Sequence, residues 1–136
     1  MNTSPVVLYV EDDPRSRRVI ELLLIREMHL EHVTILEDSS DFEQRVHALT
    51  PKPEVILLDI HVKPHSGFEM LKMLREMNDF GQVPIVALTA SVMNEEVQKL
   101  KEVGFHSVIS KPVDVDIFPS LLQRIAGGES IWRVID

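Results

Sequence analysis

The sequence reads VILLD at residues 55–59, so that four apolar residues, Val55–Leu58, come directly before an acid. A short apolar run of β-branched residues and leucine is typical of a strand that is buried on both faces. Four more stretches share this character, at Val6–Val10, Val33–Leu36, Ile85–Leu88 and Val108–Ile109. The sequence therefore predicts five short strands in the interior of the protein.

Segments with helical periodicity lie between or after these strands. Apolar side chains recur three and four residues apart, which places them on one face of a helix. The pattern occurs in three segments: Val19, Leu22 and Leu23, closed by Arg26; Met70, Met73, Leu74 and Met77; and Phe118, Leu121, Leu122 and Ile125. We interpret the methionine stripe as core rather than as a binding face. The alternation of strand and helix predicts a parallel sheet with helices on both faces and right-handed crossovers.

Residues typical of helix boundaries agree with this periodicity. Pro14 suits the first turn of a helix, and Ser39 and Asn94 are residue types that cap helix N-termini. Gly104 would end the helix that Asn94 begins, and Gly127-Gly128 would end the last helix. We therefore expect helices to begin at the first three positions and to end at the glycines.

The composition indicates one acidic globular domain. The chain has 136 residues, and 44% of them are hydrophobic, which excludes intrinsic disorder. With 14 basic and 22 acidic side chains the net charge is −8, which argues against nonspecific binding to nucleic acid. The absence of cysteine excludes disulfides, thiol catalysis and thiolate metal sites. No apolar run reaches the roughly 18–20 residues that span a bilayer, so we expect a cytoplasmic protein without membrane contact.

Polar residues with catalytic chemistry stand at the ends of four predicted strands. The first strand is followed by Glu11-Asp12-Asp13, the third by Asp59, the fourth by Thr89-Ala90 and the fifth by Ser110-Lys111-Pro112. In open parallel sheets the carboxyl ends of the strands meet at one edge, where ligands bind. We therefore expect these side chains to lie close together.

Clustered carboxylates repel each other, and two charges about 4 Å apart cost on the order of 4 kcal/mol at an effective dielectric constant of about 20. A hard divalent cation such as Mg²⁺ would offset this repulsion. It prefers oxygen ligands, whereas Zn²⁺ prefers histidine and cysteine. Lys111 and Thr89 would then bind an anion through an ammonium group and a hydroxyl group. Carboxylate, metal, ammonium and hydroxyl together indicate phosphoryl transfer to an aspartate.

Four stretches in this order resemble the receiver domain of bacterial two-component response regulators. They are VLYVEDD at residues 7–13, ILLDI at 56–60 through Gly67, VALTA at 86–90, and Lys111-Pro112. The resemblance covers about residues 6–126. It implies a flavodoxin-like α/β fold, a doubly wound (βα)5 sandwich whose five parallel strands have the order 2-1-3-4-5. It also implies a receiver domain over residues 1–126 and a C-terminal tail, 127–136, with no output domain.

The resemblance further implies a role for each residue at the strand ends. Asp59 would be the phospho-acceptor. The ligands of Mg²⁺ or Mn²⁺ would be Glu11, Asp12, Asp59 and the backbone carbonyl of His61. The phosphoryl group would be bound by Thr89 and Lys111, with access past the small Ala90 and a cis peptide bond before Pro112.

The sequence departs from the family pattern at positions that affect switching. Family members usually carry Tyr or Phe three residues before the lysine of the last strand. Here this position is Val108, so an aromatic switch is excluded there. His61 would either tune hydrolysis of the phosphorylated form or face solvent, and Ser91 is small and offers the hydrolytic water no carboxylate. The loop to Gly67 keeps the usual length, although its proline, Pro64, stands one position later.

Charged residues outside the strand ends have simpler interpretations. Asp13 is expected to be peripheral to the acidic cluster, and His29 and His32 are expected on the surface. The first turns of the first helix carry three arginines, Arg15, Arg17 and Arg18. They are either solvated surface charges or part of a surface that binds a histidine kinase.

The tail differs in character from the rest of the chain. Residues 129–136 carry the single tryptophan, Trp132, and three β-branched apolar residues. An exposed apolar tail is unfavourable, so it either folds back onto its own domain or contacts a partner or a second copy.

These residues predict a stand-alone phospho-switch. Asp59 would accept a phosphoryl group from a sensor histidine kinase or a phosphotransfer protein. The face made by the fourth helix, fifth strand and fifth helix would then change its affinity for a downstream protein or for a second copy. We expect the chain to catalyse its own phosphorylation and dephosphorylation and to have no other enzyme activity. The alternative is a receiver-like module that docks or dimerises without phosphate, as Val108 and the tail suggest. A flavin carrier is disfavoured, because no Gly- and Thr-rich loop follows the first strand.

Overall fold

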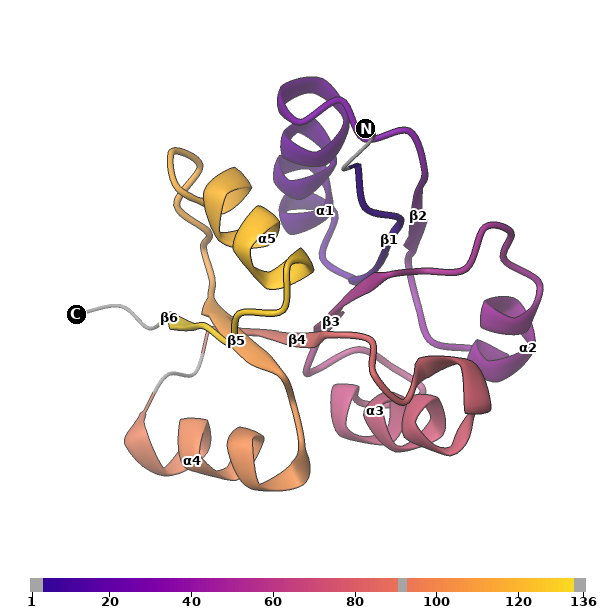
Figure 1. Ribbon diagram of the computed structural model, residues 1–136. Helices are drawn as coiled ribbons and strands as arrows, with labels where there is room; N and C mark the ends of the chain where they lie inside the picture. Colours follow the sequence, from indigo (N-terminus) through magenta and orange to yellow (C-terminus); the bar gives the residue numbers. More distant parts are fainter. Residues whose placement is uncertain (1–3, 91–92, 134–136) are drawn as a thin grey trace.

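The computed structural model of the chain describes residues 4–90 and 93–133 as one parallel sheet with helices on both faces (Figure 1). Its six strands have the order β2-β1-β3-β4-β5-β6. They are β1 (Val7–Val10), β2 (Val33–Leu36), β3 (Val55–Asp59), β4 (Ile85–Thr89), β5 (Ser107–Ser110) and β6 (Trp132–Arg133). The predicted order 2-1-3-4-5 is confirmed. The short β6, which we did not predict, extends the sheet beyond β5.

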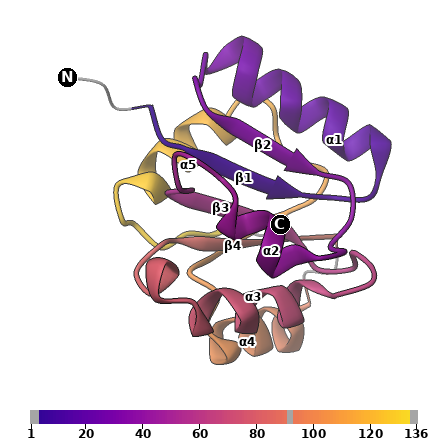
Figure 2. The same ribbon diagram turned by 90° about the vertical axis from the view of Figure 1, so that its right-hand side faces the viewer.

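Within the described residues, five α-helices pack on this sheet. They are α1 (Pro14–Glu21), α2 (Phe42–His47), α3 (Gly67–Glu76), α4 (Asn94–Val103) and α5 (Phe118–Ala126). The first continues as a π-helical segment, η1 (Leu22–Glu27), and a 3₁₀ turn, η2 (Asn78–Phe80), follows the third. One face of the sheet is covered by α1 and α5, and the other by α2, α3 and α4 (Figures 1 and 2).

The strands divide the interior into two apolar cores. In β1, Leu8 and Val10 face the α2, α3 and α4 side, whereas Val7 and Tyr9 face α1 and α5. Both β1 and β3 are buried along their whole length, because each has a neighbouring strand on both sides and helices on both faces. This burial fixes where the residues at the ends of these strands can lie.

Two of the three predicted helix faces are confirmed. On α3, Met70 is buried and Met73 packs against the same core, and Met77, directly after the helix, is buried there as well. The predicted residues of α5 are all buried: Phe118, Leu121, Leu122 and Ile125.

The predicted face of the first helix is wrong in part. Val19 and Leu22 are 39% and 44% exposed, whereas Leu23 is buried as predicted. The other residues of this segment that contact the core are Ile20 and Leu24. Both sets fit the same spacing of three and four residues, because this segment is apolar at nearly every position. Periodicity alone therefore does not determine which set is buried. The packing of the π-helical segment against α5 determines it.

Helix boundaries match the sequence in part. Pro14 begins α1, and Gly104, with a left-handed φ of 108°, ends α4. The other two predicted caps are wrong. Asn94 is the first residue inside α4 and makes no capping hydrogen bond.

Ser39 does not cap α2, which begins three residues later. Its hydroxyl donates to the carbonyl oxygen of His65 (2.7 Å) and accepts from the backbone N–H of the same residue (2.6 Å). Ser39 therefore ties the loop after β2 to the loop before α3. A hydroxyl group can serve either purpose, and the sequence does not show which partner lies within reach.

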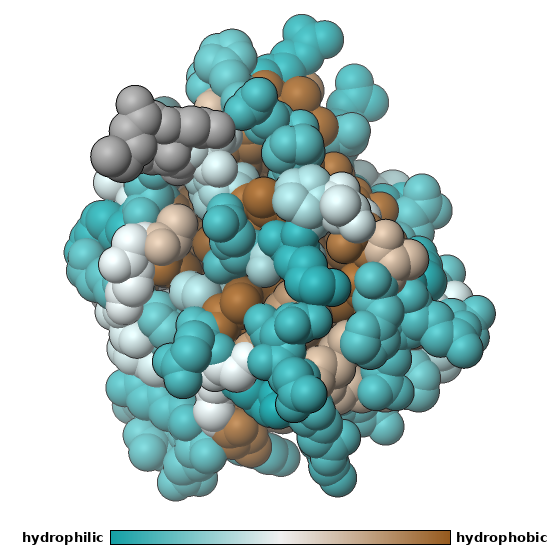
Figure 3. Space-filling view, turned by 45° about the vertical axis from the view of Figure 1, so that its right-hand side comes forward, coloured by the Kyte–Doolittle hydropathy of each residue, from teal (hydrophilic) through white to brown (hydrophobic). Residues whose placement is uncertain are grey.

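The surface on the face shown in Figure 3 is mostly hydrophilic, and its exposed apolar residues form small separate patches. His29 and His32 lie on the surface, as expected. Among the residues that the structure describes, no helix has the length and apolar character needed to cross a membrane.

Candidate functional site

The carboxyl ends of β1 and β3 bring three acidic residues together. Val10 pairs with Leu58 across these neighbouring strands, so the residues that follow, Glu11 and Asp59, emerge side by side. Together with Asp12, each can place one carboxylate oxygen within 4.8 Å of the others. Asp59 and Glu11 are buried, whereas Asp12 is exposed. The arrangement is an acidic cluster, called the acidic pocket below, whose Asp12 side is exposed to solvent.

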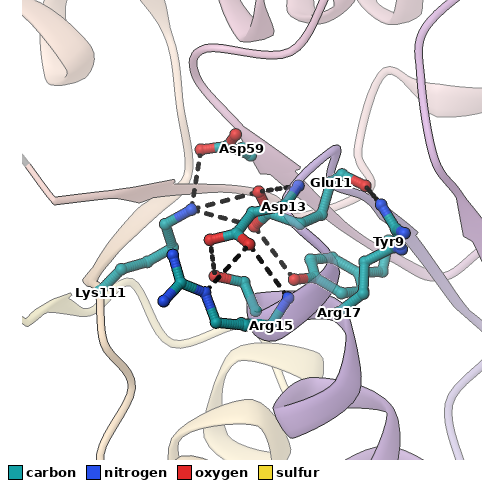
Figure 4. Close-up of polar contacts among 8 residues, drawn as sticks. Tyr9, Glu11, Asp13, Arg15, Arg17, Asp59 and Lys111 are labelled. Carbon is teal, nitrogen blue, oxygen red and sulfur yellow. Dashed lines mark hydrogen bonds and ion pairs between the residues drawn. The ribbon is translucent and has the colours of Figure 1, made fainter.

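Lys111 reaches into this pocket from the end of β5 (Figure 4). Its Nζ donates to Glu11 Oε1 at 3.0 Å and Oε2 at 3.3 Å, and to Asp59 Oδ1 at 3.2 Å. Its backbone N–H donates to the carbonyl oxygen of Thr89 (2.9 Å), which fixes the start of the side chain next to β4. One ammonium group therefore contacts two of the three clustered carboxylates, and the cluster keeps more carboxylates than ammonium groups.

Glu11 is held by hydrogen bonds on several sides. Its carboxylate accepts from the Tyr9 hydroxyl (3.1 Å) and from the backbone N–H of Asp13 (3.3 Å), besides Lys111. Burial, together with the charge of Asp59, raises the pKa of Glu11 to about 7 in spite of the neighbouring ammonium. The surroundings of this buried acid thus favour its protonated form more than water does.

The partners of Glu11 respond to the same surroundings. Burial raises the pKa of Tyr9 above its usual range, and the adjacent Glu11 carboxylate adds to this effect, so the phenol stays a hydrogen-bond donor. Burial alone would lower the pKa of Lys111, but its hydrogen bond to Glu11 and the charge of Asp59 outweigh burial and raise that pKa. Lys111 therefore stays charged.

Asp13, the third acidic residue after β1, has a different role. The Asp13 side chain accepts hydrogen bonds from the backbone N–H of Arg15 (3.0 Å) and from Ser16 Oγ (3.3 Å), and so caps α1. These bonds, that from Arg15 first, lower the pKa of Asp13. Asp13 lies outside the cluster of three carboxylates and stabilises the helix that begins beside it.

Thr89, at the end of β4, is buried beside the pocket, and the next residue, Ala90, is exposed. The exposed His61 lines a small pocket together with Thr89, Phe68 and Lys99. The Lys111–Pro112 peptide bond is cis, as expected. Ser91 lies outside the described residues.

Gly67 has a packing role at this end of the sheet. A Cβ on this residue would lie 2.9 Å from the Cα of Ile60 and 3.1 Å from the carbonyl oxygen of Asp59. Only glycine lets the start of α3 approach the end of β3 so closely.

Two residues of the site were missed in the sequence. Tyr9 donates to Glu11, and Arg17 Nη1 donates to the Glu11 backbone carbonyl (3.0 Å). Alternation along β1 puts residues 9 and 11 on the same side, which could have indicated the first contact. Of the three arginines at the start of α1, Arg17 thus supports the acidic loop, while Arg15 and Arg18 are exposed.

The comparison with protein families matches residues 7–123 to the response regulator receiver domain. The chain belongs to this family. Receiver domains act as phospho-acceptor switches of two-component systems, and they interact with histidine kinases and with downstream targets.

Among curated proteins, this receiver is 30% identical over 76 residues to the polar-differentiation response regulator DivK of Brucella anthropi. The match covers 56% of this chain and 62% of that protein, so it spans less than two thirds of the relative. It supports the family assignment and leaves the activity and partners of the whole protein to be proposed.

Solved structures give the same fold. The chemotaxis response regulator CheY4 of Vibrio cholerae is 25% identical, with a TM-score of 0.78 over 89% of this chain and 98% of that one. The receiver domain of the sensor histidine kinase PA1611 from Pseudomonas aeruginosa, determined with a magnesium ion coordinated in its active-site cleft, is also 25% identical. Its TM-score is 0.78 over 92% of this chain and 99% of that one.

Proposed function

We propose that this receiver accepts a phosphoryl group on Asp59 from a histidine kinase or a phosphotransfer protein in the cytoplasm, and signals through phosphorylation-dependent contacts with other proteins. One observation carries the proposal. Asp59 is buried at the carboxyl end of β3, hydrogen-bonded to Lys111 Nζ and within reach of the carboxylates of Glu11 and Asp12. A buried acceptor with an ammonium group and two further acids beside it is suited to phosphoryl transfer.

The transfer step follows from these contacts. A carboxylate oxygen of Asp59 attacks phosphorus and forms the O–P bond. The P–N bond of the donor phosphohistidine breaks, and its electron pair stays on the imidazole nitrogen. Lys111 Nζ, already 3.2 Å from Asp59, stabilises the charge on the phosphoryl oxygens, and the Thr89 hydroxyl donates to one of them. The exposed, small Ala90 leaves the donor access to the acceptor.

The donor set fits Mg²⁺ or Mn²⁺. Glu11, Asp12, Asp59 and the backbone carbonyl of His61 would hold the ion, since hard divalent cations prefer carboxylate and carbonyl oxygens. Three carboxylates facing one ammonium group leave an excess of negative charge that a divalent ion offsets. When bound, the ion supplies further positive charge next to the transferring phosphoryl group.

The chemistry is confined to the chain's own aspartate. Hydrolysis of the acyl phosphate returns Asp59 to its free form, and the His61 side chain, at the pocket that Thr89 also lines, tunes the approach of water. The receiver therefore acts as a switch with self-phosphorylation and self-dephosphorylation, and not as an enzyme for an external metabolite.

Intact-mass spectrometry with acetyl phosphate and Mg²⁺ tests the acceptor. The wild-type chain is expected to gain the mass of one phosphoryl group, and Asp59→Asn is expected to gain none. Asp79→Asn is the matched control, because Asp79 forms a surface ion pair with Lys52 (3.4 Å) away from the site, and it should behave as wild type. Phosphorylation of the Asp59→Asn variant would refute Asp59 as the acceptor.

A further inference from the structure

Two features of the sequence that the proposed function does not use meet at the edge of the sheet. Val108 stands where family members usually carry an aromatic residue, and Trp132 belongs to the tail. In the structure β6 lies beside β5 (Figure 1). The two strands pair in parallel, and Trp132 is the partner of Val108. The tail therefore places an aromatic side chain beside the position where β5 lacks one.

The tail is attached to β5 by specific contacts. The backbone N–H of Val108 donates to the carbonyl oxygen of Ile131 (2.8 Å). The N–H of Ile131 donates to Ser107 Oγ (2.9 Å), and the Ile131 side chain is buried. These contacts occupy the edge of β5, which is otherwise open to another strand.

The Trp132 ring also connects the tail to α4. It is half-buried against the core on the α2, α3 and α4 side, and Lys101 Nζ lies 4.9 Å from its ring centroid. A cation over an aromatic face is attractive. The tail thus holds β5 and α4 together across their outer surface.

The same β5 strand leads directly to the phosphorylation site. Lys111 follows the last residue of β5, Ser110, which pairs with Thr89 on β4. A phosphoryl group on Asp59 adds negative charge beside Lys111 Nζ and draws the ammonium group away from Glu11. Val108 lies three residues before Lys111, so β5 connects the lysine of the site with the residue that pairs with the tail.

The described part of the tail is also a short element at the edge of the sheet. Its strand has two residues, and it follows Gly128, whose φ of 108° suits glycine. The connection to α5 consists of exposed residues and includes the Arg124–Glu129 ion pair. Short elements with few buried contacts open more readily than central strands.

We propose that β6 is the switch element of this receiver. It is docked on β5 and α4 through Trp132 when Asp59 is free, and it is released when Asp59 is phosphorylated, which uncovers the edge of β5 and the adjoining surface of α4. This inference rests on the proposed function, because the phosphoryl group on Asp59 is the signal. Trp132 takes the part of the aromatic residue that Val108 cannot supply.

The single tryptophan of the chain makes the test direct, since all tryptophan fluorescence comes from Trp132. Acrylamide quenching is measured before and after treatment with acetyl phosphate and Mg²⁺, and the mass of each sample is recorded in parallel. The quenching constant should rise about twofold in the phosphorylated wild-type chain, as expected for local release of a half-buried side chain. The Asp59→Asn variant should show no change.

Variants at the contacts separate docking from the signal. Lys101→Gln and Ser107→Ala should raise quenching without phosphate and reduce the further rise on phosphorylation. Lys72→Gln is the control, because Lys72 is an exposed lysine on α3, on the same side of the sheet as α4. Circular dichroism verifies that each variant is folded.

The outcomes discriminate between the two proposals. A chain that gains a phosphoryl group with unchanged or lower quenching would refute the release of β6 and leave the proposed function intact. A wild-type chain that gains no phosphoryl group would overturn the proposed function and, with it, this inference. An equal response of the Asp59→Asn variant would show that the reagents, and not Asp59, act on Trp132.

Discussion

The centre of the sheet and its β5–β6 edge are built differently. At the centre, β1 and β3 are buried along their whole length; Glu11 directly follows β1, and Asp59 is the last residue of β3. At the edge, β6 contributes two residues and contacts β5 through few hydrogen bonds. A rigid centre keeps the reacting groups in place, whereas an edge with little buried surface can change its state at small cost. The chemistry and the readout thus lie on elements of different local stability.

The largest difference between the two regions is expected in the free energy of unfolding. Leu57→Ala, in the fully buried β3, should lower it by about 2–5 kcal/mol, because the substitution leaves a cavity between two packed layers. Ile131→Ala, next to β6, should cost less, because this side chain is 9% exposed at the edge of the sheet whereas Leu57 is fully buried. Urea unfolding followed by circular dichroism measures both. Equal losses would mean that the edge is as firmly packed as the centre.

At the centre, removing the ammonium group should impair the chemistry. Lys111→Gln takes away the positive group that contacts Asp59 and Glu11, so phosphorylation by acetyl phosphate should slow about 100-fold, as for loss of one charge-stabilising donor in other enzymes. Mass spectrometry over time gives the rate. Lys52→Gln, which removes a surface lysine paired with Asp79, serves as the control and should keep the wild-type rate.

Glu11 should also give the centre a distinct pH dependence. Its pKa is raised from the ordinary 4.5 to about 7, so between these values the folded chain retains a proton that the unfolded chain has lost. Stability of the metal-free protein should therefore fall as pH rises through this window, by at most about 1.4 kcal/mol per pH unit from this group.

The comparison with Glu11→Gln isolates this contribution, since the amide does not titrate. Unfolding in urea is measured at several pH values with EDTA present, so that no metal competes with the proton. The variant should lack the part of the slope that Glu11 supplies. Identical slopes for both proteins would contradict the raised pKa.

The smallest effect is expected at the edge. Ser107→Ala removes the acceptor of the Ile131 N–H and should lower the free energy of unfolding by about 1 kcal/mol or less, the range for one hydrogen bond. The Ser107→Ala substitution should change the hydrogen-exchange rate of the Val108 amide more clearly than the stability, because that amide donates to the Ile131 carbonyl oxygen of the tail. Ser120→Ala, on the exposed side of α5, is the control. Unaltered exchange at Val108 would show that Ser107 does not hold β6.

Much of the fold could be predicted from short-range patterns. The five apolar runs became β1 to β5, with bounds that differ by at most one residue at either end. The positions of Asp59 and Glu11 at strand ends followed directly, because a buried strand must end where charged residues begin. Gly104 ended α4 because a left-handed φ favours glycine.

Other features could not be predicted for identifiable reasons. The buried face of the first helix was ambiguous, because this segment is apolar at nearly every position and two overlapping sets of residues have helical spacing. The set that includes Leu24 packs in the core, and the set that includes Leu22 does not. The hydroxyl of Ser39 found its partner at His65, on a loop 26 positions away. The pairing of Trp132 with Val108 was left open between folding back and binding a partner, and the structure shows it within the chain.

The sequence by itself determined the strands, the order of strand and helix, and the residue types at the strand ends, because periodicity and chain breakers act over a few neighbouring residues. Only the tertiary structure decided which of these residues meet. Lys111 contacts Glu11 from 100 positions away, and the tail reaches the edge of β5. Such contacts depend on the packing of both cores and on hydrogen bonds across the sheet, which no local stretch of sequence encodes.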